Sequence, residues 1–122
     1  MRILIVEDEP LISLHLETVV TEAGHEVADR AATGLDAVRA AQRTRPDLVL
    51  MDIGLAGDMD GVAAAREIFR RWQVRSLFVS AISDRYKDTA ADTRPLGFLT
   101  KPVAPRQLLE AIEAAAKELR SG

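Results

Sequence analysis

The chain has 122 residues, of which 48% are hydrophobic and 29% charged, with a net charge of −3 and no cysteine. This length suits one domain over residues 1–122 with its own hydrophobic core, and the composition excludes a disordered chain. The lack of cysteine excludes disulfides, thiol catalysis and thiolate metal sites, and the acidic charge argues against direct binding of nucleic acid.

The first half of the chain alternates between predicted strands and helices. Residues 3–6 form an apolar run that predicts a buried strand and is too short for a signal-peptide core or a membrane span. Residues 10–22 predict a helix with an apolar stripe, which Gly24 ends. A weaker edge strand at 25–30, where polar residues intrude, and a helix at 34–42 follow.

The second half continues the alternation. In chain order we expect a strand at 48–51, a helix at 61–71, a strand at 77–79, a weaker helix at 84–91, a strand at 98–99 and a helix at 105–119. Five such alternations are typical of an α/β fold, here a doubly wound, five-stranded parallel sheet with helices on both faces. We expect the flavodoxin-like strand order 2-1-3-4-5.

Polar residues end the buried runs in a pattern that predicts a binding site. Glu7 and Asp8 follow the first strand, Asp52 the third, Ser80 the fourth and Lys101 the fifth. The carboxyl ends of parallel strands share one edge of the sheet, and the expected strand order reverses between the first and third strands. We therefore expect Glu7, Asp8 and Asp52 to converge at that edge.

The predicted carboxylate cluster requires a cation. Crowded carboxylates repel one another and raise one another's pKa values unless a cation neutralises them. Mg²⁺ prefers oxygen ligands and keeps positions open for water and phosphate oxygens. With Lys101 opposite, the set suits phosphoryl transfer to a carboxylate nucleophile. Each acid alone is equally well explained as a solvated cap, so the prediction depends on the ordered set.

Five ordered motifs resemble those of response-regulator receiver domains, the phosphoacceptors of two-component signalling. They are IVEDEP at 5–10, VLMD at 49–52, MDG at 59–61, VSA at 79–81 and GFLTKP at 97–102. Each motif is weak alone, but their order and spacing are specific, and the match runs from residue 2 to about residue 119. The resemblance is to single-domain regulators of the chemotaxis type.

The resemblance implies roles for the acidic residues. Asp52 would be the phosphoacceptor, taking a phosphoryl group from a histidine kinase or a histidine phosphotransfer protein. Asp52 and Asp8 would bind Mg²⁺ directly, Glu7 would hold it through water, and Gly54 would contribute its backbone carbonyl. Such a domain assists its own phosphorylation and dephosphorylation and is not otherwise an enzyme.

The resemblance also implies how phosphorylation changes the conformation of the protein. Lys101 and Ser80 would bind the phosphoryl group, and Pro102 would follow a cis peptide bond that fixes the approach of the lysine. Ser80 and Phe98 would then switch position and change how the face around the fourth helix, the fifth strand and the fifth helix contacts an unknown downstream protein. Plain core packing is an equally good explanation of Phe98.

Three features depart from the family pattern. The stretch 53–60 is one residue longer than usual and has Ala56 where proline is common, which predicts a mobile loop. The stretch 80–98 is one residue shorter and contains Pro95, which predicts a short or frayed fourth helix that does not reach Arg94. Gly54 and Ile82 flank the phosphoryl site and are expected to affect the lifetime of the phosphoryl group.

Proteins of other functional classes have parts of this sequence pattern. A flavodoxin-like electron carrier needs a hydroxyl- and glycine-rich phosphate loop where this chain has Glu7, Asp8 and Glu9. A phosphatase with an aspartyl nucleophile would need a second acid two residues after Asp52, where Gly54 stands. A degenerate receiver acting as a scaffold is disfavoured by the complete acid, hydroxyl and lysine set. We expect a cytoplasmic phosphoacceptor without membrane contact, either stand-alone or part of a larger regulator.

Overall fold

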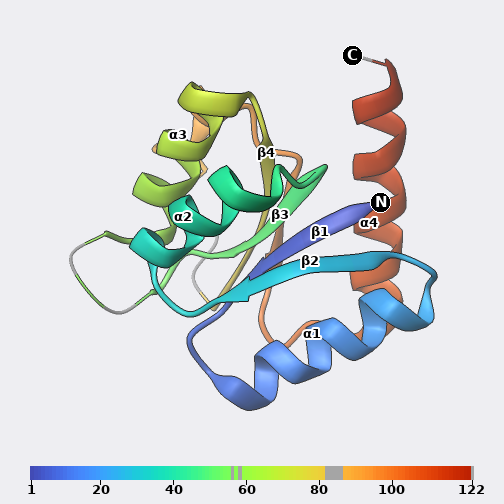
Figure 1. Ribbon diagram of the computed structural model, residues 1–122. Coiled ribbons are helices and arrows are strands. Elements are labelled where there is room, and N and C mark those ends of the chain that lie inside the picture. Colours follow the sequence, from blue (N-terminus) through green and yellow to red (C-terminus); the bar gives the residue numbers. More distant parts are fainter. Residues whose placement is uncertain (56, 58, 82–86, 122) are drawn as a thin grey trace.

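A five-stranded parallel sheet forms the centre of the structure (Figure 1). The computed structural model describes residues 1–55, 57, 59–81 and 87–121. The strands are β1 (Arg2–Val6), β2 (Glu26–Ala31), β3 (Leu48–Asp52), β4 (Arg75–Ser80) and β5 (Gly97–Thr100). They lie in the order β2-β1-β3-β4-β5, and every neighbouring pair is parallel. The predicted fold and strand order are confirmed.

In the described part of the chain, four α-helices cover the sheet, two on each face (Figure 1). They are α1 (Pro10–Glu22), α2 (Gly34–Thr44), α3 (Gly61–Trp72) and α4 (Pro105–Ser121). Buried residues of α2 and α3 pack together on one face, and those of α1 and α4 pack on the other. These helices match the predicted ones to within two residues at each end. The fold is therefore doubly wound.

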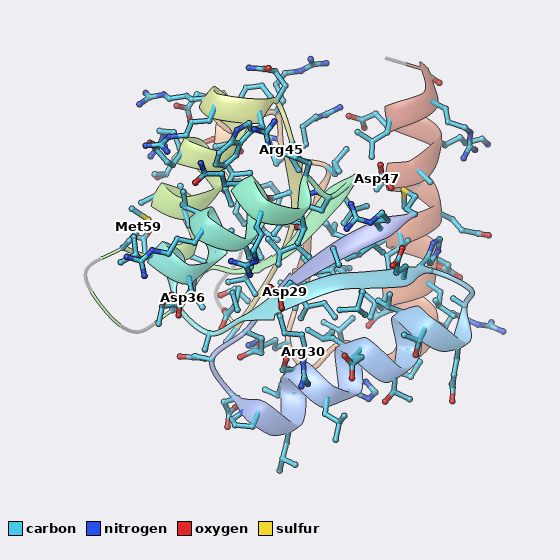
Figure 2. The ribbon with its side chains drawn as sticks, in the orientation of Figure 1. Asp29, Arg30, Asp36, Arg45, Asp47 and Met59 are labelled. Atoms are coloured by element: carbon cyan, nitrogen blue, oxygen red, sulfur yellow. The ribbon has the colours of Figure 1, made fainter. Side chains whose placement is uncertain are left out.

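The edge strand β2 is partly exposed, and its polar side chains pair with helices on both faces of the sheet. The side chain of Asp29 pairs with Arg43 of α2. Arg30 points toward α1 (Figure 2), where its Nε lies 3.6 Å from Oε2 of Glu17. By contrast, the central strands β3 and β4 are buried throughout. The prediction of a weak edge strand is confirmed, with a shift of one residue.

The connection between β4 and β5 differs from the predicted helix at 84–91. Residues 84–86 lie outside the described residues, and residues 87–90 form turns that lead into a short 3₁₀ helix, η2 (Ala91–Thr93). Arg94 then adopts a left-handed conformation with φ 51°. The helix is therefore absent from the described part of its range. The ring of Pro95 clashes with the backbone of the preceding residue in a helical conformation, which accounts for the lack of an α-helix through Arg94, as expected.

We also compared the described helices with the requirements for crossing a membrane. None of them combines the length and the apolar character that a bilayer-spanning helix requires.

One buried hydroxyl yields a prediction about stability. The Ser76 Oγ in β4 is buried and has no hydrogen-bond partner among the residues that the structure describes. Because an unpaired buried hydroxyl costs free energy, Ser76→Ala should raise the free energy of unfolding by about 1 kcal/mol in urea denaturation.

Thr93 provides the matched control for this change. Its buried hydroxyl donates a 2.7 Å hydrogen bond to the Ala90 carbonyl. Thr93→Val should therefore lower the free energy of unfolding by about 1 kcal/mol. Loss of stability in Ser76→Ala would mean that the Ser76 hydroxyl is in fact bonded.

Candidate functional site

The polar residues at the strand ends meet at one edge of the sheet, as predicted. Asp52 is the last residue of β3, Ser80 ends β4, and Glu7, Asp8 and Lys101 directly follow β1 and β5. One carboxylate oxygen each from Glu7, Asp8 and Asp52 lies within 4.8 Å of the others. Glu7 and Asp52 are only 3% and 5% exposed, so two of the three acids are buried.

Lys101 reaches into this carboxylate cluster from the opposite side. Its Nζ donates a hydrogen bond to Glu7 Oε1 at 2.6 Å and lies 3.4 Å from Asp52 Oδ2. The backbone N–H of Lys101 also donates to the Ser80 carbonyl at 3.0 Å, and the bond between Lys101 and Pro102 is cis. The lysine is therefore held between two carboxylates at the carboxyl ends of β1 and β3.

Burial and charge act in opposite directions on these groups. Burial, the largest cause, raises the pKa of the Glu7 carboxyl, and the negative charge of Asp52 adds to the rise. Hydrogen bonds from Lys101 and from the backbone of Glu9 lower it but do not outweigh burial. For Lys101, burial lowers the pKa, but the hydrogen bond to Glu7 and the charges of Asp52 and Glu7 raise it above its ordinary value.

The cluster fits a divalent cation. When all three carboxylates are ionised they carry three negative charges, and Lys101 supplies one positive charge, so two negative charges remain for a further cation to balance. All three ligands are oxygens, the type that Mg²⁺ prefers. The acidic cluster could therefore hold a metal ion, and the identity of that ion as Mg²⁺ stays a prediction.

The residues after Asp52 contribute backbone groups to the site. The Gly54 N–H donates to Asp52 Oδ1 at 3.0 Å and so orients the carboxylate. The carbonyl of Gly54 as a metal ligand stays a prediction. The described parts of the loop at 53–60 contain bends and no helix or strand, while Ala56 and Ile82 lie outside the described residues. The expected loop mobility and the effect of Ile82 therefore stay predictions.

Sequence reasoning missed the structural role of Gly61, the first residue of α3. Its N–H donates to the Ile53 carbonyl at 3.0 Å, and a Cβ at this position would lie 2.0 Å from the Asp52 carbonyl oxygen. Asp60 caps the helix by accepting from the Ala63 N–H at 2.8 Å. The signal in the sequence was the Asp-Gly pair at a helix start, but its close approach to Asp52 is a tertiary feature.

The proposed switch residues lie close to the core. Ser80 is buried at the end of β4. The ring of Phe98 stacks on Phe78, with centroids 5.2 Å apart and planes 15° from parallel. Phe98 is only half-buried, so its ring packs against the core while part of it faces outward.

The raised pKa of Glu7 predicts a pH dependence in the absence of divalent cations. A carboxyl whose pKa is raised in the folded state contributes stability that is present below its unfolded pKa, near 4.5, and is lost as pH rises through the folded pKa. In EDTA, wild type should therefore lose stability relative to Glu7→Gln as pH rises above 4.5. Thermal denaturation of both proteins from acid to neutral pH measures this, and parallel profiles would contradict it.

Comparisons with known proteins agree with this geometry. A family model described as "Response regulator receiver domain" matches residues 3–113. The chemotaxis protein CheY of Thermotoga maritima is 31% identical over an alignment 123 residues long, and the match covers 95% of this chain and 98% of that protein. The signal receiver domain of a modulated diguanylate cyclase from Desulfovibrio desulfuricans G20 has a TM-score of 0.88 and 34% identity, with 97% of this chain and 94% of that chain covered.

Other relatives are longer than this chain. The transcriptional regulatory protein PdtaR of Mycobacterium tuberculosis is 36% identical over 120 residues, and the match covers 98% of this chain but 58% of that protein. The chain therefore spans less than two thirds of PdtaR, and the similarity is confined to that part.

Proposed function

Because the chain belongs to the response-regulator receiver-domain family, we propose that Asp52 accepts a phosphoryl group from a histidine kinase or a histidine phosphotransfer protein. One observation carries the proposal: the carboxylates of Glu7, Asp8 and Asp52 gather within 4.8 Å at the sheet edge, with Lys101 beside them. This arrangement supplies a nucleophile, a metal-binding pair and a cation in one place.

The transfer follows from the chemistry of the groups. A carboxylate oxygen of Asp52 attacks phosphorus, the phosphorus–nitrogen bond to the donor histidine breaks, and the imidazole nitrogen takes up a proton. The Gly54 N–H on Oδ1 orients the nucleophile. Bound Mg²⁺ would be held by Glu7, Asp8 and Asp52, with the Gly54 carbonyl as a further ligand, and would neutralise charge on the transferring oxygens.

Lys101 is placed to bind the product. Its Nζ already lies 3.4 Å from Asp52 Oδ2. A phosphoryl group on Asp52 offers it new oxygen acceptors, so the lysine exchanges part of its bonding to Glu7 for a charge-assisted bond to phosphate. The hydroxyl of Ser80, one strand away, serves as a second donor.

The output is a change in protein contacts. Ser80 moves toward the phosphoryl group, and Phe98 responds by changing its packing against Phe78. The surface around β5 and its flanking segments then differs between the two states and is recognised by a downstream protein. The protein assists its own phosphorylation and dephosphorylation, and it carries the signal rather than turning over a substrate.

The test is incubation with acetyl phosphate and Mg²⁺, followed by intact-protein mass spectrometry. We expect a single phosphoryl adduct that is labile to hydroxylamine, as an acyl phosphate is, and that is absent when EDTA replaces Mg²⁺. Lack of any adduct with Mg²⁺ would contradict the proposal and favour the scaffold hypothesis. Continuous turnover of a generic phosphomonoester would favour a phosphatase.

A further inference from the structure

Two arginines from β4 and α3 hold residues 87–96, the last part of the connection between β4 and β5, which we call the β4–β5 connection. Arg66 of α3 makes a two-pronged contact with the carboxylate of Asp92: its Nε donates to Oδ2 at 2.8 Å and its Nη2 to Oδ1 at 3.1 Å. The same Nη2 donates to the Thr89 carbonyl at 2.8 Å. The hydrogen bonds from Arg66 are the main reason that the pKa of Asp92 lies below its ordinary value. This contact, the Arg66–Asp92 anchor, ties the connection to α3.

The second anchor ties the end of the connection to α4. Arg75, the first residue of β4, donates from Nε to the Arg94 carbonyl at 2.6 Å. Its Nη2 pairs with the Glu118 carboxylate of α4. The Arg75 side chain is only 9% exposed, and a buried guanidinium needs such partners. The connection is therefore fixed at Thr89 and Asp92 by one arginine and at Arg94 by another.

Between the anchors the connection packs into the core. Ala90 and Thr93 are buried, and the Thr93 hydroxyl donates to the Ala90 carbonyl. Ala90 belongs to the apolar cluster that contains Phe78 and against which Phe98 packs. The connection thus lies against the same group of residues as the proposed switch.

The position of the connection in the chain makes the anchors relevant to switching. It belongs to the stretch that joins Ser80, at the end of β4, to Phe98, in β5. If the chain after Ser80 moves toward a phosphoryl group, the conformation of this stretch must change. If Phe98 moves, the packing of this stretch against the core changes. Anchors that hold its far end oppose both movements.

We propose that the Arg66–Asp92 and Arg75–Glu118 anchors stabilise the unphosphorylated arrangement, and that the Arg66–Asp92 anchor is released when Asp52 is phosphorylated. This inference rests on the proposed function. Because the two events are linked, their effects on each other are equal in free energy. The free energy by which phosphorylation weakens the anchor equals the free energy by which loss of the anchor favours phosphorylation. The anchors set how readily the protein switches, although neither touches the acidic site.

The test uses Asp92→Asn, which keeps the shape of the side chain but removes its charge. Asp92 is about half exposed, so this variant should fold. With acetyl phosphate and Mg²⁺ it should gain the phosphoryl adduct roughly threefold faster than wild type, the effect of losing one well-oriented surface ion pair. Hydrogen exchange of amides in residues 89–94 should be faster in the unphosphorylated variant, and in wild type it should rise on phosphorylation.

The control is Glu67→Gln. Glu67 Oε1 pairs with Arg71 Nε at 2.5 Å on the same helix as Arg66 and makes no ion pair with the described residues 87–96. This variant should match wild type in rate and exchange. If wild type forms the adduct and Asp92→Asn forms it at the same rate, with unchanged exchange at 89–94, this inference alone is overturned. If wild type forms no adduct, the proposed function fails and the inference with it.

Discussion

Replacing Asp52 with asparagine should abolish uptake of a phosphoryl group altogether. The amide has nearly the size of the carboxylate, and its oxygen can still accept the hydrogen bond that the Gly54 N–H makes to Asp52 Oδ1. It lacks the negative oxygen that attacks phosphorus, so no acyl phosphate forms. Intact-protein mass spectrometry after incubation with acetyl phosphate and Mg²⁺ should show only the unmodified variant.

The folded structure should survive this change. The Asp52→Asn substitution would remove one of two buried negative charges while leaving Glu7 to pair with Lys101 at 2.6 Å. Asp36→Asn is the matched control, because Asp36 is an exposed carboxylate in the first turn of α2 and contacts Arg39 rather than the site. This control should take up the phosphoryl group as wild type does. An adduct that persists in Asp52→Asn would place the phosphoacceptor at another residue.

Replacing Gly61 with alanine should destabilise the protein by about 3 kcal/mol or more, because the added methyl group has no room. It would lie 2.0 Å from the Asp52 carbonyl oxygen and 2.7 Å from the Ile53 Cα. Both neighbours are backbone atoms that cannot rotate away. Either the end of β3 or the start of α3 must move, so the hydrogen bond from the Gly61 N–H to the Ile53 carbonyl is lost or distorted.

Displacement of the Asp52 backbone should also slow phosphorylation at the site. Asp52 provides both the clashing carbonyl and the nucleophilic carboxylate, so the folded fraction of Gly61→Ala should be phosphorylated more slowly than wild type. Urea denaturation measures the loss of stability, and the adduct rate measures the effect on the site.

Gly54→Ala is the control for this substitution. A Cβ at position 54 would meet only Asp52 Oδ1, at 3.8 Å, which is ordinary contact. The same chemical change two residues after Asp52 should therefore shift the free energy of unfolding by no more than about 1 kcal/mol. Equal stabilities of the two alanine variants would contradict the close approach of Gly61 to β3.

Much of the fold and of the candidate site was predictable from the sequence, because both depend on local patterns. Continuous apolar runs identify strands that are buried on both faces, and their alternation with amphipathic helices limits the topology to a parallel sheet. The convergence of Glu7, Asp8 and Asp52 then follows from a rule of such sheets, that strand ends share one edge.

The local sequence pattern was insufficient to predict the structure of residues 84–91, where we expected a helix. In its described part, residues 87–91 form turns and the start of η2. What stabilises that shape comes from elsewhere in the chain, namely Arg66 of α3 and Arg75 of β4. Helical propensity in a short segment is small beside such contacts. The arginines carry no local signal that assigns them to this connection.

The sequence by itself determined the alternation of buried strands and amphipathic helices and the position of acidic residues at strand ends, and its motifs indicated the strand order through their resemblance to receiver domains. Only the tertiary structure decided that Lys101 pairs with Glu7, 94 residues away, that Gly61 must lack a side chain, and that two arginines hold the β4–β5 connection. The physical reason is that these features depend on distances between atoms far apart in the chain, which packing sets and local composition does not.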